Sequence, residues 1–314
     1  MGRWTAIALL GALAAGCSAA GTSNTPTLGT DSRTLANGFG PASSTPGLRA
    51  NGWLSPDRHK HPSLFYWGNY DTSTITIYSA GKVKGQITSG LYNPERLFVG
   101  KDGSVYATNI GYNGSNKNSI VGYKPGKTTP FITITNGVNR PTGLTVDAAG
   151  TIYCANVGND TITVYKKGQT SPSLTIPYFA EYLATDAKDN LYAAGTAVEV
   201  FAPGSTTGKD TGLPHYPGAL EVDRNGNIIV LYGATIEYFP AGQTKASKQI
   251  TVNGSPFALS LSGNEKTLYV SVESGTPFVI QKVAYPNGTT LSNYLTTNAG
   301  DWPIAASPDN ALGG

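Results

Sequence analysis

The sequence predicts an all-β fold, a six-bladed β-propeller built from four-stranded antiparallel blades. Three observations support this: an aromatic residue followed three residues later by glycine recurs six times, a strand–turn–strand piece recurs with it, and helical periodicity of useful length is absent. The aromatics are spaced 36 to 46 residues apart, in the range of a four-stranded blade. The pairs are Tyr78/Gly81, Tyr123/Gly126, Tyr165/Gly168, Phe201/Gly204, Phe239/Gly242 and Tyr285/Gly288.

The strand–turn–strand piece is clearest in residues 141–153, PTGLTVDAAGTIY, and its counterparts begin at Pro94, Ala180, Pro217 and Pro256. Each copy predicts a short apolar first strand, a tight polar turn and a second strand. An aromatic recurs in the second strand at Phe65, Tyr106, Tyr153, Tyr192 and Tyr269, with Ile229 in the remaining copy. Alternating stretches predict the third strand at 161–165 and the fourth at 131–135 and 249–252.

One blade is predicted to combine both ends of the folded region. Residues 301–309 resemble a first strand with no second strand after it, whereas the repeat at 65–89 has no convincing first strand before it. Pairing the two closes the ring and leaves only short edges. The segment 52–57 is the alternative source of that strand.

The amino terminus predicts a processed envelope protein. Residues 1–17 contain one arginine, an apolar stretch too short to span a bilayer, and Ala14-Ala15-Gly16-Cys17, which resembles the bacterial lipobox except that Ala14 stands where Leu is usual. We expect a signal peptide over 1–17 with Cys17 lipidated, a flexible tether over 18–50, and the propeller over 51–314. Cleavage of a plain secretory signal near Ala19 or Ala20 is the alternative. The expected location is the bacterial cell envelope, facing the periplasm or exterior.

The composition limits the classes of binding partner to be expected. The net charge is +3, only 13% of residues are charged, and no basic run occurs, which argues against nucleic-acid binding and leaves the lipid anchor as the expected contact with a membrane. Cys154 has no partner once Cys17 is acylated, so no disulfide is expected. Its apolar surroundings favour a small buried hydrophobe over the alternative, a reactive nucleophile.

The stretch PTGLTVDAAGTIYCANVGNDTITVY, residues 141–165, resembles the NHL-repeat and SMP-30/gluconolactonase-like propellers of bacterial secreted proteins. The resemblance extends over about residues 53 to 309 and implies the propeller fold. These families include lactonases, lyases and non-catalytic binding modules, so the resemblance does not fix an activity.

Candidate ligand-binding residues are expected at one mouth of the channel, where the starts of the six first strands meet. The position after the recurring proline gives one residue per blade: Glu95, Thr142, Glu181, Gly218, Phe257 and Trp302. Neighbouring candidates are Arg96, Arg140, Tyr182, His215 and Tyr216. Aromatic side chains, together with the amide-rich insertion at 109–119, suit a polar ligand, a glycan or a protein partner.

A metal-dependent hydrolase is the alternative function. Resemblance to SMP-30-like lactonases implies a divalent metal at the mouth, held by a Glu and by Asn or Asp residues. Glu95 and Glu181 match that pattern in part, with Ca²⁺ or another divalent ion as the cofactor, but no Asn or Asp matches. Ion pairing with Arg96 or Arg140 is the competing role of the two glutamates.

Two other features suggest catalysis less strongly than the pair of glutamates does. Streptogramin-lyase-like propellers use mouth histidines, whereas His59 and His61 lie in the lead-in segment and only His215 is placed near the mouth. Asp147, Asp186 and Asp223 recur at the ends of first strands, which predicts structural bonds to turn backbone. We therefore expect a non-catalytic binding module without a cofactor. A structural envelope protein, with Phe257 and Trp302 filling the mouth, is a third reading.

Overall fold

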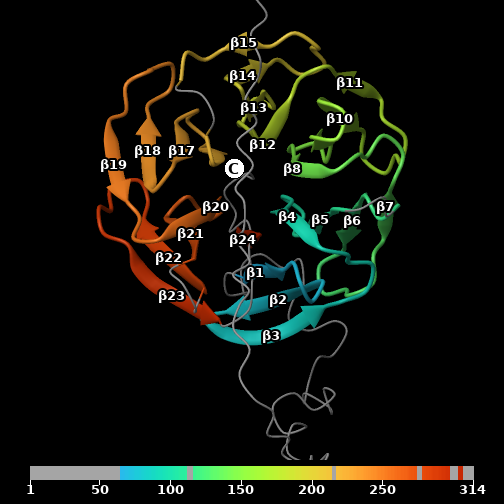
Figure 1. Cartoon of the computed structure of the whole chain (residues 1–314), viewed down its shortest axis with the longest axis horizontal. Coiled ribbons are helices and arrows are strands. Elements are labelled where there is room, and N and C mark those ends of the chain that lie inside the picture. The colour runs from blue at the N-terminus through green and yellow to red at the C-terminus, as the bar shows by residue number, and fades with distance from the viewer. Residues whose placement is uncertain (1–63, 112–115, 214–216, 274–277, 298–302, 307–314) are drawn as a thin grey trace, which may run out of the picture. The chain divides into compact units, whose positions relative to one another are not determined.

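A computed structural model describes residues 64–111, 116–213, 217–273, 278–297 and 303–306. These residues form six four-stranded antiparallel sheets arranged in a ring (Figure 1). The predicted six-bladed propeller is therefore confirmed. Among the described residues, no helix is long and apolar enough to cross a bilayer.

The blades follow one another along the chain, except that blade 1 takes its innermost strand from the end of the described chain. Blade 1 comprises β24 (Ile304–Ala306), β1 (Leu64–Asn69), β2 (Thr74–Ser79) and β3 (Lys82–Ile87). Blade 2 comprises β4 (Pro94–Val99), β5 (Val105–Asn109), β6 (Ser119–Tyr123) and β7 (Ile132–Ile134). Blade 3 comprises β8 (Pro141–Val146), β9 (Ile152–Asn156), β10 (Thr161–Tyr165) and β11 (Leu174–Ile176).

The other three blades have the same order. Blade 4 comprises β12 (Ala180–Thr185), β13 (Leu191–Gly195), β14 (Val198–Phe201) and β15 (Lys209–Asp210). Blade 5 comprises β16 (Ala219–Val222), β17 (Ile228–Tyr232), β18 (Thr235–Phe239) and β19 (Lys248–Thr251). Blade 6 comprises β20 (Ser255–Leu261), β21 (Thr267–Glu273), β22 (Phe278–Ala284) and β23 (Ser292–Thr297).

The ring is closed by strand β24. It pairs antiparallel with β1, Trp67 opposite Ile304 and Phe65 opposite Ala306, and it contacts β4 and β20 on either side. The prediction that the carboxy-terminal segment supplies the inner strand is confirmed for Ile304–Ala306. The competing segment 52–57 lies outside the described residues.

The turns between first and second strands have the backbone that their sequences predict. Gly103, Gly150, Asp189, Gly226 and Glu265 each adopt a positive φ there. Gly and Asp tolerate this left-handed conformation well, and tight hairpins require it.

The aromatics of the recurring aromatic–glycine motif pack between blades. Tyr123 and Tyr165 are fully buried, and their hydroxyls donate to the carbonyls of Ser89 and Asn136, each at 2.7 Å, in the linker that enters the blade. Phe201, Phe239 and Tyr285 are buried as well. Because these aromatics fill the core in one blade after another, the repetition of the motif is explained by a structural role.

Cys154, on β9, is completely buried and free. Burial raises the pKa of its thiol, and only the thiolate is strongly nucleophilic. The prediction of a small buried hydrophobe is confirmed.

The recurring aspartates hold turns, as predicted. Asp147 accepts from the backbone N–H of Thr151 at 2.7 Å, and Asp223 accepts from that of Asn227 at 2.8 Å. Asp186 accepts from the Asn190 N–H at 2.9 Å.

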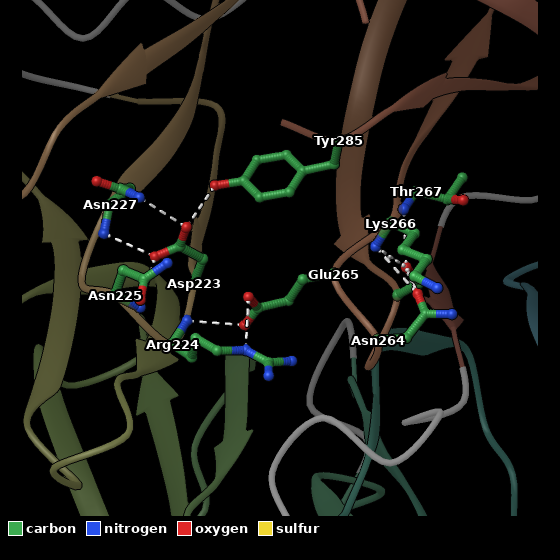
Figure 2. Close-up of polar contacts among 10 residues, drawn as sticks. Asp223, Arg224, Asn225, Asn227, Asn264, Glu265, Lys266, Thr267 and Tyr285 are labelled. Carbon is green, nitrogen blue, oxygen red and sulfur yellow. Dashed lines mark hydrogen bonds and ion pairs between the residues drawn. The ribbon is translucent and has the colours of Figure 1, made fainter. Parts of the chain in front are cut away.

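The turn aspartates of blades 3 and 5 also accept a hydrogen bond from a tyrosine hydroxyl. In blade 3 the tyrosine belongs to the same blade, whereas in blade 5 it belongs to blade 6. In blade 3, Tyr153 donates to Asp147 Oδ2 at 3.2 Å within the blade. Blade 5 has Ile229 at the matching position, and Tyr285 of blade 6 donates to Asp223 Oδ2 at 2.7 Å instead (Figure 2).

Carboxylates on the same turns link successive blades. Glu265 of blade 6 accepts from the backbone N–H of Arg224 at 2.7 Å and from its Nε at 2.9 Å (Figure 2). Asp189 of blade 4 accepts from the backbone N–H of Ala148 in blade 3 at 3.2 Å. We call this contact, from one turn to the carboxylate of the next, the inter-blade clamp.

Ring closure predicts the effect of truncating a β24 side chain. Ile304 is 4% exposed and packs with Phe65 and Trp67, so Ile304→Ala should lower the free energy of unfolding by about 2–4 kcal/mol in a denaturant titration. Val83→Ala, on the 63%-exposed position of β3, is the matched control and should change little. Equal losses in the two variants would contradict the role given to β24.

Candidate functional site

The predicted mouth positions coincide with irregularities in the first strands. The pairing register skips Glu95 in β4, Thr142 in β8, Glu181 in β12 and Phe257 in β20, so each is the extra residue of a β-bulge. A bulge leaves its extra residue unpaired and re-aims its side chain. Four blades thus present a bulged residue at the start of the strand nearest the channel.

Blades 2 and 4 bring four predicted residues together at this mouth. A guanidinium nitrogen of Arg96 lies 3.7 Å from Glu95 Oε1, with both side chains 17% exposed. The same guanidinium lies over the ring of Tyr182, 4.5 Å from its centroid. Arg96 therefore connects the two blades by a cation–π contact.

Glu95 and Glu181 interact electrostatically. Burial raises the pKa of the Glu95 carboxyl; the Arg96 guanidinium opposes that rise and the Glu181 carboxylate adds to it. The pairing of Glu95 with Arg96, foreseen as the competing role, is present.

Two buried polar atoms at the mouth have no hydrogen-bond partner among the described residues. These are Arg96 Nε, a donor, and Thr142 Oγ1, which can donate and accept. Leaving a buried polar group unsatisfied costs about 1–3 kcal/mol. Such atoms indicate where a ligand's polar groups could bind.

The structure describes three further predicted mouth residues. Arg140 is exposed with a φ of 49°, and its carbonyl accepts from the Val157 N–H. The Gly218 N–H donates to the Leu231 carbonyl, and Phe257 is half-buried. Predictions for Cys17, His59, His61, His215, Tyr216 and Trp302 fall outside the described residues.

The insertion predicted at 109–119 is fixed at both ends. Asn109 Nδ2 donates to Ser119 Oγ at 2.9 Å, and the Gly111 N–H donates to Asn118 Oδ1 at 2.8 Å. Residues 112–115 lie outside the described part.

A cavity of about 140 Å³ lies below the mouth and is lined by all six innermost strands. Arg96 and Tyr182 line it near the strand starts, and Ser262 and Glu265 line it beyond the end of β20. Glu95, Thr142, Glu181 and Phe257 are not part of its lining. The mouth cluster and the cavity therefore meet at Arg96 and Tyr182.

Glu221 is a channel residue that sequence reasoning missed. It lies on β16 opposite Ile229, where the second strand of the other blades carries its recurring aromatic. Residues opposite those aromatics in the other blades are Phe98, Thr145, Ala184, Ser260 and Ala306. All six line the cavity, and Glu221 is the ionisable one. That single acidic residue in an otherwise neutral repeat position was the available signal.

The surroundings of Glu221 favour its neutral form. Burial raises its pKa to about 8, and a hydrogen bond from the Leu261 backbone N–H opposes the rise. A carboxylic acid with a raised pKa in a polar cavity can donate a hydrogen bond. Thr145 and Thr185 add hydroxyl oxygens 3.4 Å apart on the same wall.

The described residues contain no group of three or more His, Cys, Asp or Glu side chains placed to hold a metal ion. Glu95 and Glu181 would supply part of the six to eight oxygens that calcium takes.

No protein-family model and no curated protein matches the chain. Among solved structures, it is similar to a chain in the crystal structure of a nidogen/laminin complex, with TM-score 0.60, 18% identity, and 78% of this chain and 98% of that one covered. A functionally unknown protein from Desulfotomaculum acetoxidans DSM 771 gives TM-score 0.55 and 13% identity, over 78% and 99% of the two chains. Hydrazine synthase from Kuenenia stuttgartiensis gives TM-score 0.50 and 16% identity, over 69% and 72%. At these identities the likeness shows the propeller fold alone.

Glu221 predicts a pH dependence of stability. Its pKa rises from 4.5 to about 8 on folding, so the folded state holds the proton more tightly and stability falls as pH rises through that window. Glu221→Gln, which mimics the neutral acid, should match the wild type near pH 4 and exceed it near pH 9, by a few kcal/mol at most. Denaturant titrations across this range measure the difference. Parallel pH profiles for the two proteins would show that Glu221 does not titrate in this way.

Proposed function

We propose that this protein is a lipid-anchored bacterial envelope protein, of the NHL-repeat and SMP-30-like kind of propeller, that binds a polar ligand at its channel mouth without catalysis. A glycan fits the site best. The observation behind this choice is the pair of unsatisfied buried atoms, Arg96 Nε and Thr142 Oγ1, beside the aromatic Tyr182. Sugar hydroxyls both donate and accept hydrogen bonds, as these two atoms require.

The mouth offers few groups for chemistry. Arg96 and Glu95 are engaged with each other, and Tyr182 lies under the guanidinium. These contacts fix side chains in place, which suits recognition by a preorganised site.

Thr142→Val tests the ligand site. The change removes a hydroxyl that has no partner among the described residues, so the free energy of unfolding should not fall. Affinity for a glycan selected on an array should drop about five- to tenfold, the value of one hydrogen bond. The full chain in detergent is compared by calorimetry with Thr175→Val, on the exposed outer strand β11, which should bind normally. Absence of any glycan binding, with a protein captured at the mouth instead, would shift the proposal to a protein partner.

A metal-dependent lactonase remains the second candidate, because Glu181 lies close enough to raise the pKa of Glu95. A calcium-dependent rise in melting temperature that is lost in both Glu95→Gln and Glu181→Gln would favour it over the binding module. If calcium changes the melting temperature of neither the wild type nor the two variants, the lactonase is excluded.

The anchor has its own test. Cys17→Ser should abolish incorporation of labelled palmitate and release the protein from the membrane fraction, because the thiol is the acylation site of a lipobox. Ser18→Ala should leave both unchanged. Membrane retention by the Cys17 variant would indicate another means of attachment.

A further inference from the structure

The contact between blades 4 and 5 lacks the inter-blade clamp. At the turn position of Asp189 in blade 4 and Glu265 in blade 6, blade 5 has Gly226, whose N–H makes the same turn bond to the Asp223 carbonyl. Glycine has no carboxylate to accept from the preceding turn. In blade 4 the residue that matches the N–H donors Ala148 and Arg224 is Ala187. The next turn offers its N–H no carboxylate.

Two further features leave this contact open. Strand β15, the outermost of blade 4, has only two residues. Gly150 in blade 3 also lacks a carboxylate, but the Lys167 side chain lies over it, whereas the nearest side-chain atom at Gly226 belongs to Ala241. A cavity of about 460 Å³ lies between blades 4 and 5. This is within the size range of small-molecule sites.

The lining of this inter-blade pocket includes three cationic residues among polar and apolar ones. Lys188 comes from the β12–β13 turn, Lys209 from β15 and Arg224 from the β16–β17 turn. The Arg224 Nε is bonded to Glu265, and its terminal nitrogens point away from that carboxylate (Figure 2).

The two carboxylates of the lining are directed elsewhere. Asp186 Oδ1 accepts from the N–H groups of Lys188 and Asn190, and its Oδ2 accepts from Asn190 Nδ2 at 2.8 Å. These bonds use the carboxylate within its own turn.

Asp210 lies on the opposite face of its strand. It pairs with Glu199, and its charge raises the pKa of that carboxyl, whereas Lys209 pairs with Val200, which lines the pocket. Successive strand residues point to opposite faces. The side of β15 that faces the pocket is therefore cationic.

We propose that the blade 4–5 pocket is a second binding site, for a small organic anion with at least two negatively charged oxygen groups, either carboxylates or a phosphate. It lies at the opposite end of the first strands from the mouth and does not depend on the proposed glycan site. Lys188 and Lys209 supply the charge. The backbone of Gly226 and Gly242, with φ of 78° and 72°, leaves the wall free of side chains.

The test uses the full chain in detergent and two probes, citrate and glucose 6-phosphate, in calorimetric titrations at matched ionic strength. We expect saturable binding of at least one probe at millimolar concentration or tighter, weakening as sodium chloride is raised. The probe that binds distinguishes carboxylate from phosphate recognition. Lys209→Gln should weaken binding at least fivefold, and the exposed Lys166→Gln in blade 3 should not change it.

A pair of variants at one position provides the sharper comparison. Gly226→Asp introduces a carboxylate at the pocket wall, and Gly226→Asn introduces a neutral side chain of the same size. Both residue types tolerate a positive φ, and a Cβ there would meet Ala241 at an ordinary 3.7 Å. The Asp variant should lose binding at least tenfold more than the Asn variant.

Thr142→Val should leave anion binding unchanged, which separates this site from the mouth. No saturable binding of either probe would overturn the proposal. Equal affinity in the wild type, Lys209→Gln and Gly226→Asp would overturn it as well, because the anion would then bind elsewhere.

Discussion

Closure of the ring is the constraint on which the rest of the structure depends. Each blade buries its two faces against its neighbours, so no blade has a complete core until all six are in place. The last contact is made by β24, whose three residues pair with β1 and pack against β4 and β20. The mouth and the channel cavity exist because this short strand completes the inner wall.

The residues divide into those that repeat and those that occur once. Tyr123 and Tyr165 make the same buried contact in two blades, since each hydroxyl donates to a carbonyl of the linker that enters its blade. The turn aspartates likewise repeat their hydrogen bonds from blade to blade. Glu221 departs from its repeat position, and Arg96 makes a contact that other blades do not repeat; both line the channel cavity. Residues that differ from their repeat counterparts therefore draw attention to the channel cavity in this propeller.

The repeats made the fold, the blade boundaries and the closing strand predictable, because each repeat carries the same periodic pattern and turn signals. The mouth positions could be identified because they follow the recurring proline, and they coincide with bulges at Glu95, Thr142, Glu181 and Phe257. Glu221 was missed because an acidic residue in a short apolar strand says nothing of which wall it faces. The blade 4–5 pocket was missed because its lining comes from separate turns and strands of two blades, and the length of β15 cannot be read from the repeat spacing.

The pairing of β1 with β24 also sets the order in which the molecule can assemble. Some 234 residues separate Asn69 from Ile304, against four between β1 and β2. At about 0.6 kcal/mol for each doubling of loop length, joining the distant pair costs roughly 3–4 kcal/mol more than forming the hairpin. A chain synthesised from its amino terminus would build blades 2 to 6 while blade 1 had only three of its four strands. Only a full-length polypeptide could finish the circle, so a prematurely terminated one would keep an unpaired edge open to proteases.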